Sequence, residues 1–253
     1  MADLAPAFLD WLAALEERHL ANLTRAELTR SLRALSSCYV ERRSRLSSGA
    51  ALDGAGKRAA FALFYAPLHF LAIDRIVRAL GADALKIDAL IDLGCGTGAA
   101  GAAWAVACAR PPRVSGIDRN PWAMQEANWT YRHFAIRGRA ATGDVMTASA
   151  RGQRGAVLLA YTANELPDDK RARLLDRVVE RSRAGEPVLV VEPIARSATR
   201  WWSEWTDRMT SEGARIDEWR FPAALPPLLS EIARGAGLDS KELTARTIFS
   251  RRN

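Results

Sequence analysis

The sequence predicts an α/β fold in which a mostly parallel sheet of about seven strands follows an N-terminal helical extension. From about residue 86 onward, short β-rich runs alternate with helical patterns, and repeated βα units imply a right-handed parallel sheet with helices on both faces. Glycines follow the first of these strands, and acids follow the next two. We therefore expect a helical extension or cap over residues 1–84 and an α/β domain over residues 85–253.

Helical patterns fill the first 80 residues. The run Thr24 to Glu27 is a capping-box pattern, and leucines recur at helical spacing from Leu28 to Leu35. A second apolar helical stripe runs from Phe61 to Leu71, and Pro67 is expected to start or bend a helix within it. This part of the chain is typical of a substrate-side extension rather than of a catalytic domain.

The periodicity of the remaining chain divides it into strands and helices. The fourth strand is apolar enough to be buried on both faces, and the last strand is expected at or near a sheet edge. Strands are expected at residues 89–93, 113–117, 139–142, 156–161, 187–191 and 243–250. Helices are expected at residues 99–109, 121–134, 168–183, 197–212 and 226–236.

Composition and the first residues favour a soluble cytoplasmic protein. The N-terminus lacks the basic start and apolar run of a secretory signal, and no apolar stretch approaches the roughly 18 to 20 residues that span a bilayer. We therefore expect no membrane partner. Cys38, Cys95 and Cys108 lack the spacing of a disulfide framework or of a cysteine metal site, so no metal is expected.

Residues 94–101 contain two overlapping glycine motifs that indicate different ligands. Gly94, Gly96 and Gly98 form a G-x-G-x-G loop, whereas Gly96 to Gly101 fits the G-x-G-x-x-G dinucleotide fingerprint. In either frame the glycines let the backbone turn sharply and approach a ligand that a Cβ would block. The acids that surround the loop decide between the frames.

Three acids at strand ends favour S-adenosylmethionine over a dinucleotide. Ligands of open parallel sheets bind beyond the carboxyl ends of the strands, where Asp92, Asp118 and Asp144 lie. Asp118 can accept both ribose hydroxyls of either ligand, whereas Asp92 suits the ammonium group of a methionine tail and is an odd neighbour for a pyrophosphate. Asp144 is suited to accept from the adenine amino group. The alternative for Asp144 is a turn acid that only caps the residues after it.

Over residues 85–195 the chain resembles the class I S-adenosylmethionine-dependent methyltransferases. The resemblance rests on the motif Asp92 to Gly98, on Gly116-Ile117-Asp118, on Gly143-Asp144 and on the end of the fourth strand. It implies a Rossmann-like class I methyltransferase sheet, S-adenosylmethionine as the cofactor, and methyl transfer as the activity. The first segment would border the methionine part of the donor, the second its ribose and the third its adenine. The cofactor-binding residues so implied are Asp92, Gly94, Cys95, Gly96, Thr97, Gly98, Asp118, Asp144 and Val145.

The residues after the fourth strand are expected to meet the methyl acceptor. The charge of the donor supplies much of the reactivity, so the protein chiefly positions the nucleophile and removes its proton. The catalytic candidates are Tyr161, Asn164 and Glu165. The Asn-Pro-Pro-Tyr pattern of methyltransferases that act on amino groups of adenine or glutamine is absent, because this chain has Asn-Glu-Leu-Pro. Glu165 either serves as a base or hydrogen-bond acceptor, or caps the helix that starts near Asp168.

A narrower resemblance is carried by the run Ala160 to Pro167, by Val188 to Pro193, and by the helix Ala59 to Leu80. These segments are similar to a methyltransferase-like family associated with assembly of the mitochondrial small ribosomal subunit, and to its bacterial relatives. The resemblance implies rRNA or the small ribosomal subunit as a partner. Mitochondrial members carry cysteines after the fifth strand that bind an iron-sulfur cluster. Residues 194–205 contain no cysteine, so we expect no cluster here.

An excess of arginine supports nucleic acid as a partner. The chain has 36 basic and 29 acidic residues, a net charge of +7, and arginine binds phosphate bidentately. A general coding bias toward arginine is the alternative. Trp201, Trp202 and Trp205 could stack bases, although Trp201 and Trp205 share a helix face typical of a core, which leaves Trp202 turned away. The candidates for phosphate contacts are Arg42, Arg43, Arg45, Arg137, Arg139, Arg251 and Arg252.

The leading functional hypothesis from sequence is therefore a methyltransferase that acts on RNA or on a ribosome-associated target. Two alternatives stay open beside it. One is a non-catalytic ribosome assembly factor with a methyltransferase fold, and the other is a small-molecule methyltransferase whose residues 1–80 form a lid. A dinucleotide-dependent oxidoreductase comes last.

Overall fold

The computed structural model describes residues 4–41, 52–146, 155–194, 200–238 and 241–251. The chain forms two compact units. The first comprises Met1–Leu71 and Phe221–Leu243, and the second comprises Ala72–Arg220 and Thr244–Asn253. Residues 72–84, which we assigned to the extension from sequence, thus lie in the second unit together with the sheet.

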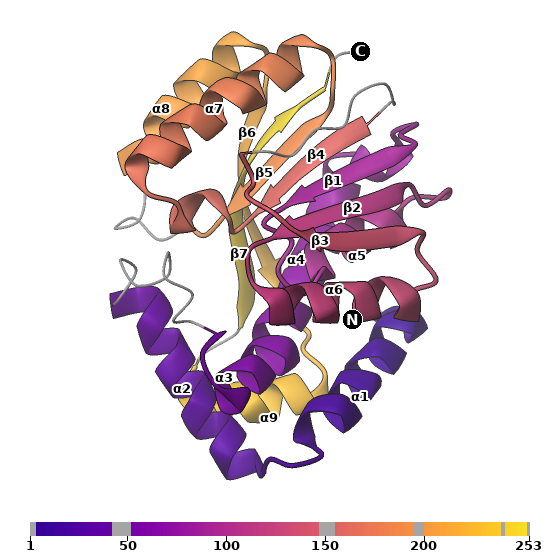
Figure 1. Cartoon of the computed structure of the whole chain (residues 1–253), viewed down its shortest axis with the longest axis vertical. Helices are drawn as coiled ribbons and strands as arrows, with labels where there is room; N and C mark the ends of the chain where they lie inside the picture. The colour runs from indigo at the N-terminus through magenta and orange to yellow at the C-terminus, as the bar shows by residue number, and fades with distance from the viewer. Residues whose placement is uncertain (1–3, 42–51, 147–154, 195–199, 239–240, 252–253) are drawn as a thin grey trace. The chain divides into compact units, whose positions relative to one another are not determined.

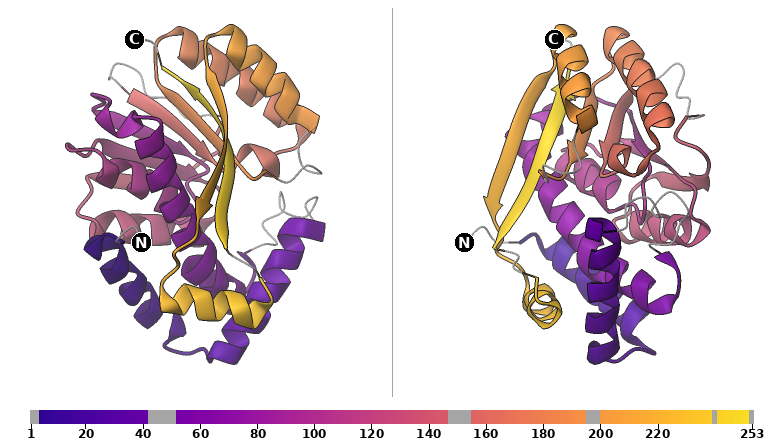
Figure 2. Two further views of the ribbon diagram at one scale, coloured as in Figure 1. Left: turned by 180° about the vertical axis from the view of Figure 1, so that it is seen from behind. Right: turned by 90° about the vertical axis from the view of Figure 1, so that its left-hand side faces the viewer.

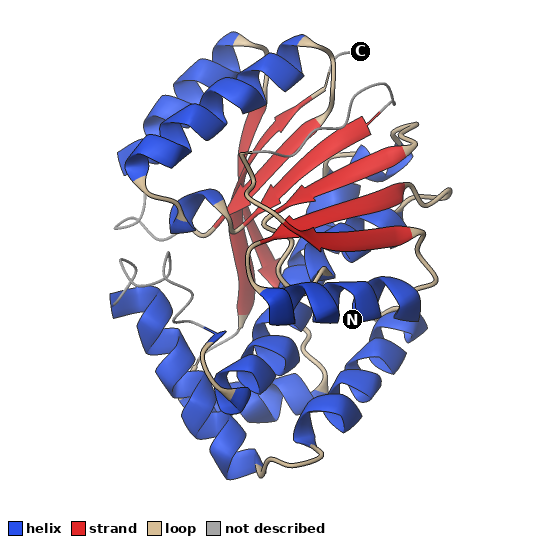
Figure 3. Cartoon of the chain, in the orientation of Figure 1, coloured by secondary structure: helices blue, strands red, loops and turns tan. Residues whose placement is uncertain are grey.

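The second unit is built on a seven-stranded mixed sheet with the strand order β3-β2-β1-β4-β5-β7-β6 (Figures 1 and 3). The first five strands are parallel, and β7 is antiparallel to β5. The expectation of a mostly parallel sheet of about seven strands is confirmed. The strands are β1 (Ala89–Leu93), β2 (Arg113–Asp118), β3 (Gly138–Thr142), β4 (Gly155–Ala160), β5 (Val188–Glu192), β6 (Arg215–Pro222) and β7 (Glu242–Ser250).

The order of the strands reverses between β1 and β4. The chain runs outward from β1 to β2 and β3 and then returns to pair β4 with the other side of β1. In open parallel sheets such a switch point opens a crevice at the carboxyl ends of the two strands. The loops after β1 and β4 are therefore the place where this fold builds a ligand site.

Alternation along β1 assigns the helices of this unit to opposite faces of the sheet. Ile91 and Leu93 pack into a core with α7 (Asp168–Arg183) and α8 (Arg200–Ser211). Leu90 and Asp92 point to the other face, because successive side chains of a strand alternate. There Asp92 meets α5 (Ala99–Ala107), and the neighbouring Gly116 meets Tyr131 of α6 (Pro121–His133). Both faces are therefore covered by helices, as expected from the βα pattern.

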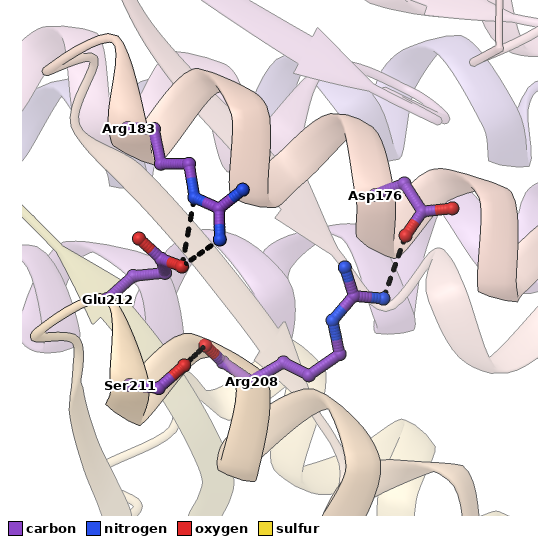
Figure 4. A network of polar contacts seen from close by, with 5 residues as sticks. All are labelled: Asp176, Arg183, Arg208, Ser211 and Glu212. Atoms are coloured by element: carbon purple, nitrogen blue, oxygen red, sulfur yellow. Dashed lines mark hydrogen bonds and ion pairs between the residues drawn. The ribbon is translucent and has the colours of Figure 1, made fainter.

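Ion pairs join α7 to α8 on the outside of this core (Figure 4). Arg183 donates from Nε and from a terminal nitrogen to Glu212 Oε1, at 2.9 and 2.6 Å. Arg208 pairs with Asp176 at 2.8 Å. Exposed pairs of this kind contribute little to stability, so the buried apolar face holds the two helices in place.

The first unit is helical. Its helices are α1 (Pro6–Leu20), α2 (Arg25–Glu41), α3 (Ala55–Ala60), a π-helix (Phe61–Tyr65), the start of α4 (Ala66–Ala79) and α9 (Pro227–Ala236). The predicted capping box is present at the start of α2: the Thr24 amide donates to Glu27 Oε2 at 2.8 Å, and the Glu27 amide donates to Thr24 Oγ1 at 3.2 Å. Phe70 packs against Phe8 and Trp11, with ring centroids 5.3 and 5.5 Å apart.

Pro67 is the second residue of α4, in keeping with the expectation that it starts or bends a helix. It lies in a continuous helix over residues 55–79, just after the π-helix, where the Ala66 amide reaches back five residues to the Phe61 carbonyl. This wide turn ends immediately before Pro67, whose nitrogen has no hydrogen to donate to a helix hydrogen bond. By length and composition, the same helix is long and apolar enough to cross a membrane. This corrects the expectation that no apolar stretch approaches the length of a membrane span. A buried core helix passes the same test, and 72% of its most apolar window is buried.

The strand β6 was not predicted from the sequence. Its side chains alternate between half-buried and exposed, and Ile216 is 38% exposed, so no strong apolar face marks the strand. Figure 2 shows β6 beside β7, where it forms the edge of the sheet. β7 therefore lies one strand in from the edge. The indole Nε1 of Trp219 donates to Thr247 Oγ1 at 2.9 Å and ties the two strands together.

Candidate functional site

The glycine loop turns sharply beyond the end of β1. Gly94, Gly96 and Gly98 have φ values of 72°, 51° and 77°, a region that favours glycine. The amides of Gly94 and Cys95 both donate to the Ile117 carbonyl, at 2.8 and 3.0 Å, so the loop is anchored on β2. A Cβ at Gly94 would overlap Thr162, and one at Gly98 would lie 3.0 Å from the Ala127 backbone of α6. The loop thus makes the sharp turn that the motif predicted, and its glycines also allow close packing against Thr162 and α6.

Asp118 lies where β2 ends and holds the glycine loop directly. Its Oδ2 accepts from the Gly96 amide at 2.9 Å, and its Oδ1 accepts from the Asn120 amide at 2.8 Å. Asp118 is half-buried, and a carboxylate offers about four acceptor positions. It can therefore fix the loop and still accept from two hydroxyl groups of a ligand.

Asp92 lies beneath the loop and is 1% exposed. Its Oδ2 accepts from the Gly101 amide at 3.0 Å, while its Oδ1 is buried and has no hydrogen-bond partner in the part of the chain that the structure describes. Burial raises the pKa of Asp92 to about 7, the Gly101 bond opposes the shift, and the charge of Asp118 adds to it. An approaching cation would compensate this carboxylate.

Gly101 packs directly against the carboxyl group of Asp92. A Cβ at this position would lie 2.6 Å from Asp92 Oδ2. The third glycine of the second motif is thus explained by a buried carboxylate, which would repel a pyrophosphate. The geometry favours the frame that starts at Gly94.

Asp144 has two partners within the protein. Its Oδ1 accepts from the Met146 amide at 3.0 Å, and its Oδ2 pairs with Lys170 Nζ at 3.0 Å. The pKa of Asp144 is lowered, chiefly by the Met146 bond, with Lys170 and Arg119 adding to the effect. The turn-capping role that the sequence left open is thus present, and contact with adenine stays a prediction. Val145 is 6% exposed and packs in the α7 core.

Cys95 and Thr97 shape the loop from inside. Cys95 is 6% and Thr97 is 4% exposed. A Cβ at Gly116 would lie 2.8 Å from Cys95 Sγ, so the thiol fills the space beside that glycine. Burial raises the pKa of the Cys95 thiol. If these residues meet a ligand, their backbone atoms are the groups best placed to do so.

The turn after β4 is fixed to the glycine loop and to α7. Thr162 Oγ1 lies 3.0 Å from the Leu93 carbonyl oxygen, which joins the two loops at the switch point. Arg171, 9% exposed, donates from Nε to the Ala163 carbonyl at 2.8 Å and from a terminal nitrogen to the Leu166 carbonyl. The Arg171 side chain, here called the clamp, thus holds the backbone of residues 161–167, here called the platform.

The three catalytic candidates lie on this platform. Tyr161 has a φ of 59°, which is rare for a residue with a side chain and is often found at functional sites. Asn164 and Glu165 are half-buried in a 3₁₀ turn (Ala163–Glu165). Burial raises the pKa of Glu165 to about 7, the charge of Asp118 adds to the shift, and Arg119 opposes it. Among the described residues Glu165 donates and accepts no side-chain hydrogen bond at the start of α7, whose N-cap is Pro167.

Glu192, at the end of β5, is fully buried behind the platform. Its Oε1 accepts from the Asn164 amide at 3.2 Å. Burial raises the pKa of Glu192 to about 8. The backbone amides of Asn164 and Ala163 and the charge of Arg246 oppose the shift, whereas the charge of Glu165 adds to it. Arg246 is the partner of Glu192 in the β5–β7 register.

Arginine side chains lie over two tryptophan rings of α8. The Arg246 guanidinium lies 4.0 Å from the centroid of the Trp202 ring, and the Arg171 guanidinium lies 5.1 Å from that of Trp201. Trp202 is 9% and Trp205 is 1% exposed. The prediction that Trp202 turns away from the core is wrong, because β7 supplies the cation that covers it. Arg137, Arg139 and Arg251 are exposed, whereas Arg42, Arg43, Arg45 and Arg252 lie outside the described residues.

Four positions of the site were not assigned a role from sequence: Thr162, Arg171, Glu192 and Arg246. Glu192 carried a signal, since it is an acid that ends a buried strand, as Asp118 is at the end of β2. Arg246 and Arg171 carried none, because their roles depend on strand pairing and on a turn that spacing alone does not define. In the described part of the chain no group of three or more histidines, cysteines or acids could hold a metal ion.

Comparisons with known proteins agree on the fold. No protein-family model and no curated protein matches the chain. The structure of the mitomycin 7-O-methyltransferase is similar, with a TM-score of 0.56 and 19% identity over 96% of this chain and 72% of that chain. The magnesium protoporphyrin IX methyltransferase from Synechocystis PCC 6803, with bound S-adenosylmethionine, gives a TM-score of 0.50 and 14% identity over 92% and 99%. The N-methyltransferase NodS from Bradyrhizobium japonicum WM9, in complex with S-adenosylhomocysteine, gives 0.50 and 16% over 71% and 85%.

The chain has the class I S-adenosylmethionine-dependent methyltransferase fold. At this identity the likeness is one of fold, and no comparison supports the narrower ribosome-assembly family. The residues fit the methyl donor of this fold by their own geometry. The unpartnered Asp92 Oδ1 suits an ammonium group, the left-handed glycines bring the backbone close, and Asp118 keeps acceptor positions for hydroxyls.

Proposed function

We propose that this protein is an S-adenosylmethionine-dependent methyltransferase. The observation that carries the proposal is the pair of acids around the glycine loop. Asp118 fixes the loop by accepting from the Gly96 amide, and Asp92 keeps one buried oxygen without a partner among the described residues. This combination suits a ligand that brings both hydroxyl groups and an ammonium group.

In this proposal each acid has a separate task toward the donor. Asp118 accepts from the ribose hydroxyls, and Asp92 attracts the ammonium group directly or through water. Asp144, with Val145 beside it, borders the adenine. The donor supplies a methyl group activated by a positively charged sulfur, so the protein has to hold the acceptor in line and exclude water.

The acceptor is expected at the turn after β4. Thr162 joins this turn to the glycine loop, and Arg171 holds its carbonyls. Asn164 and Glu165 are the side chains of the turn that can accept a hydrogen bond from a reacting amine or hydroxyl. Tyr161, whose pKa is raised by burial and by the charge of Glu192, remains a neutral phenol.

We favour a small molecule as the acceptor. Two solved structures that match more than nine tenths of this chain are methyltransferases named for mitomycin and for magnesium protoporphyrin IX. The tryptophans that could have stacked bases are covered by arginine or buried.

RNA or a ribosome-associated target is the second candidate. The net charge of +7 and the exposed Arg137, Arg139 and Arg251 support it. A non-catalytic assembly factor with this fold is a variant of the same candidate. It differs in one outcome, since its RNA binding would survive an Asp118→Ala change.

The test mixes the purified protein and labelled S-adenosylmethionine with rRNA, with ribosomal subunits, or with a small-molecule extract. Label in small molecules supports the first candidate, and label in RNA supports the second. Asp118→Ala serves as the control and should abolish transfer. Transfer that persists in this variant would contradict the proposed donor site.

A further inference from the structure

One oxygen of the buried Glu192 carboxyl group has no hydrogen-bond partner among the residues that the structure describes. The side chain is fully buried at the end of β5. Its Oε1 accepts from the Asn164 amide at 3.2 Å, but its Oε2 is buried without a hydrogen-bond partner in the described part of the chain. A buried carboxylate oxygen in this state is costly unless it carries a proton or meets another polar group.

Glu165 lies one residue beyond Asn164 in the same turn, within electrostatic reach of both Glu192 and Asp118. It is half-buried, and its side chain does not cap α7. Burial raises the pKa of Glu165 to about 7 and that of Glu192 to about 8. Two carboxyl groups in one poorly solvated place cannot readily both ionise, so their protons leave in two coupled steps.

We propose that Glu165, on the turn whose Asn164 amide is held by Glu192, accepts the proton of the methyl acceptor. The inference rests on the proposed function. In the step, a lone pair on the acceptor nitrogen or oxygen forms the bond to the methyl carbon. The electrons of the carbon–sulfur bond stay on sulfur, and the acceptor proton passes to Glu165. Glu192 is a positioning residue, because it holds the Asn164 amide and limits the charge of the pair.

Several other charged and titratable groups face this pair and set its titration. The negative charge of Asp118 acts on Glu165 from the end of β2, and Arg119 opposes it. Glu192 in turn raises the pKa of the Tyr161 hydroxyl. The groups that face the pair are Asp118 and Arg119 after β2, Tyr161 after β4, Arg171 on α7 and Arg246 on β7.

The test uses sinefungin, an analogue of the donor that carries a primary ammonium group in place of the methylated sulfur. If Glu165 faces the transferred methyl group, its carboxylate should bind this ammonium. We expect sinefungin to bind about tenfold more tightly than S-adenosylhomocysteine above neutral pH, measured by calorimetry. The preference should fall as the pH is lowered through about 7, because Glu165 then takes up a proton.

Two variants separate the roles of the carboxyl groups. Glu165→Gln should reduce the preference to less than about threefold while S-adenosylhomocysteine still binds. Glu192→Gln keeps an oxygen for the Asn164 amide but cannot ionise, so the preference should stop rising above about pH 7. Asp169→Asn removes an exposed carboxylate of α7 and should change nothing.

The outcomes distinguish this inference from the proposed function. An unchanged preference in Glu165→Gln, with normal binding of S-adenosylhomocysteine, would overturn the inference and leave the donor site intact. A preference that does not vary with pH in the wild type would overturn it too. Failure of the wild type to bind S-adenosylhomocysteine at all would instead refute the donor site.

Discussion

At the scale of single residues, the site is defined by polar atoms that the fold leaves without partners. Asp92 and Glu192 are both buried, and each has one carboxyl oxygen bonded to a backbone amide and one without a partner among the described residues. Asp118 differs, because both of its oxygens hold loop amides and the side chain stays accessible. The glycine loop thus lies between a fully buried acid, Asp92, and a half-buried one, Asp118.

Asp92 makes the stability of the ligand-free protein depend on pH. Its pKa is about 7 in the folded state and about 3.9 in an unfolded chain, so the folded state holds the proton more tightly. Its contribution to the free energy of unfolding is present below about pH 4 and is lost as the pH rises to about 7. Asp92→Asn should therefore be more stable than the wild type at about pH 8, on the order of 2 kcal/mol, and similar near pH 4.

Urea unfolding at the two pH values measures this difference. The same variant should bind S-adenosylhomocysteine more weakly, because it lacks the charge that attracts the ammonium group. Equal stability of variant and wild type at both pH values would show that burial does not raise the pKa of Asp92.

At the scale of elements, the fit of α5 on β1 depends on Gly101. An added Cβ would lie 2.6 Å from Asp92 Oδ2 and disturb the bond that the Gly101 amide donates. Gly101→Ala should lower the free energy of unfolding by about 1–3 kcal/mol. The cost should shrink in an Asp92→Ala background, where the opposing carboxylate is gone, and a double-mutant cycle in urea measures this coupling. Additive effects would contradict it.

The platform after β4 depends in the same way on Arg171. The side chain donates to the carbonyls of Ala163 and Leu166 and stacks on Trp201. Arg171→Met should lower the free energy of unfolding by about 1–3 kcal/mol, because it leaves buried carbonyls without donors. Arg173→Met, an exposed change on the same helix, should stay within about 0.5 kcal/mol of the wild type. Equal losses in both variants would show that the clamp contributes nothing.

The regular elements could be predicted from sequence to within a few residues, because buried strands such as β4 and capped helices such as α2 carry strong local patterns. The glycine loop and Asp118 followed from strand ends. β6 could not be predicted, since an edge strand without a buried face has little periodicity. The Glu192–Arg246 register and the Arg171 clamp are tertiary features, and local spacing holds no information about them.

At the scale of the whole molecule, the net charge of +7 predicts weak and unspecific attraction to RNA. The buried tryptophans of α8 leave phosphate contacts as the main contribution. The affinity for rRNA fragments should therefore fall at least about tenfold between about 50 and 200 mM salt, without preference for sequence. Filter binding over a salt series measures it. Tight, sequence-specific and salt-resistant binding would favour the ribosomal candidate.

Donor binding is the claim on which the rest of the account depends. Calorimetric titration with S-adenosylhomocysteine tests it most directly, with NADH as the competing ligand and Asp118→Ala as the control variant. We expect one binding site for S-adenosylhomocysteine, at least about a hundredfold weaker binding in the variant, and no heat from NADH. Binding of NADH without binding of S-adenosylhomocysteine would contradict it and restore the dinucleotide frame of the glycine loop.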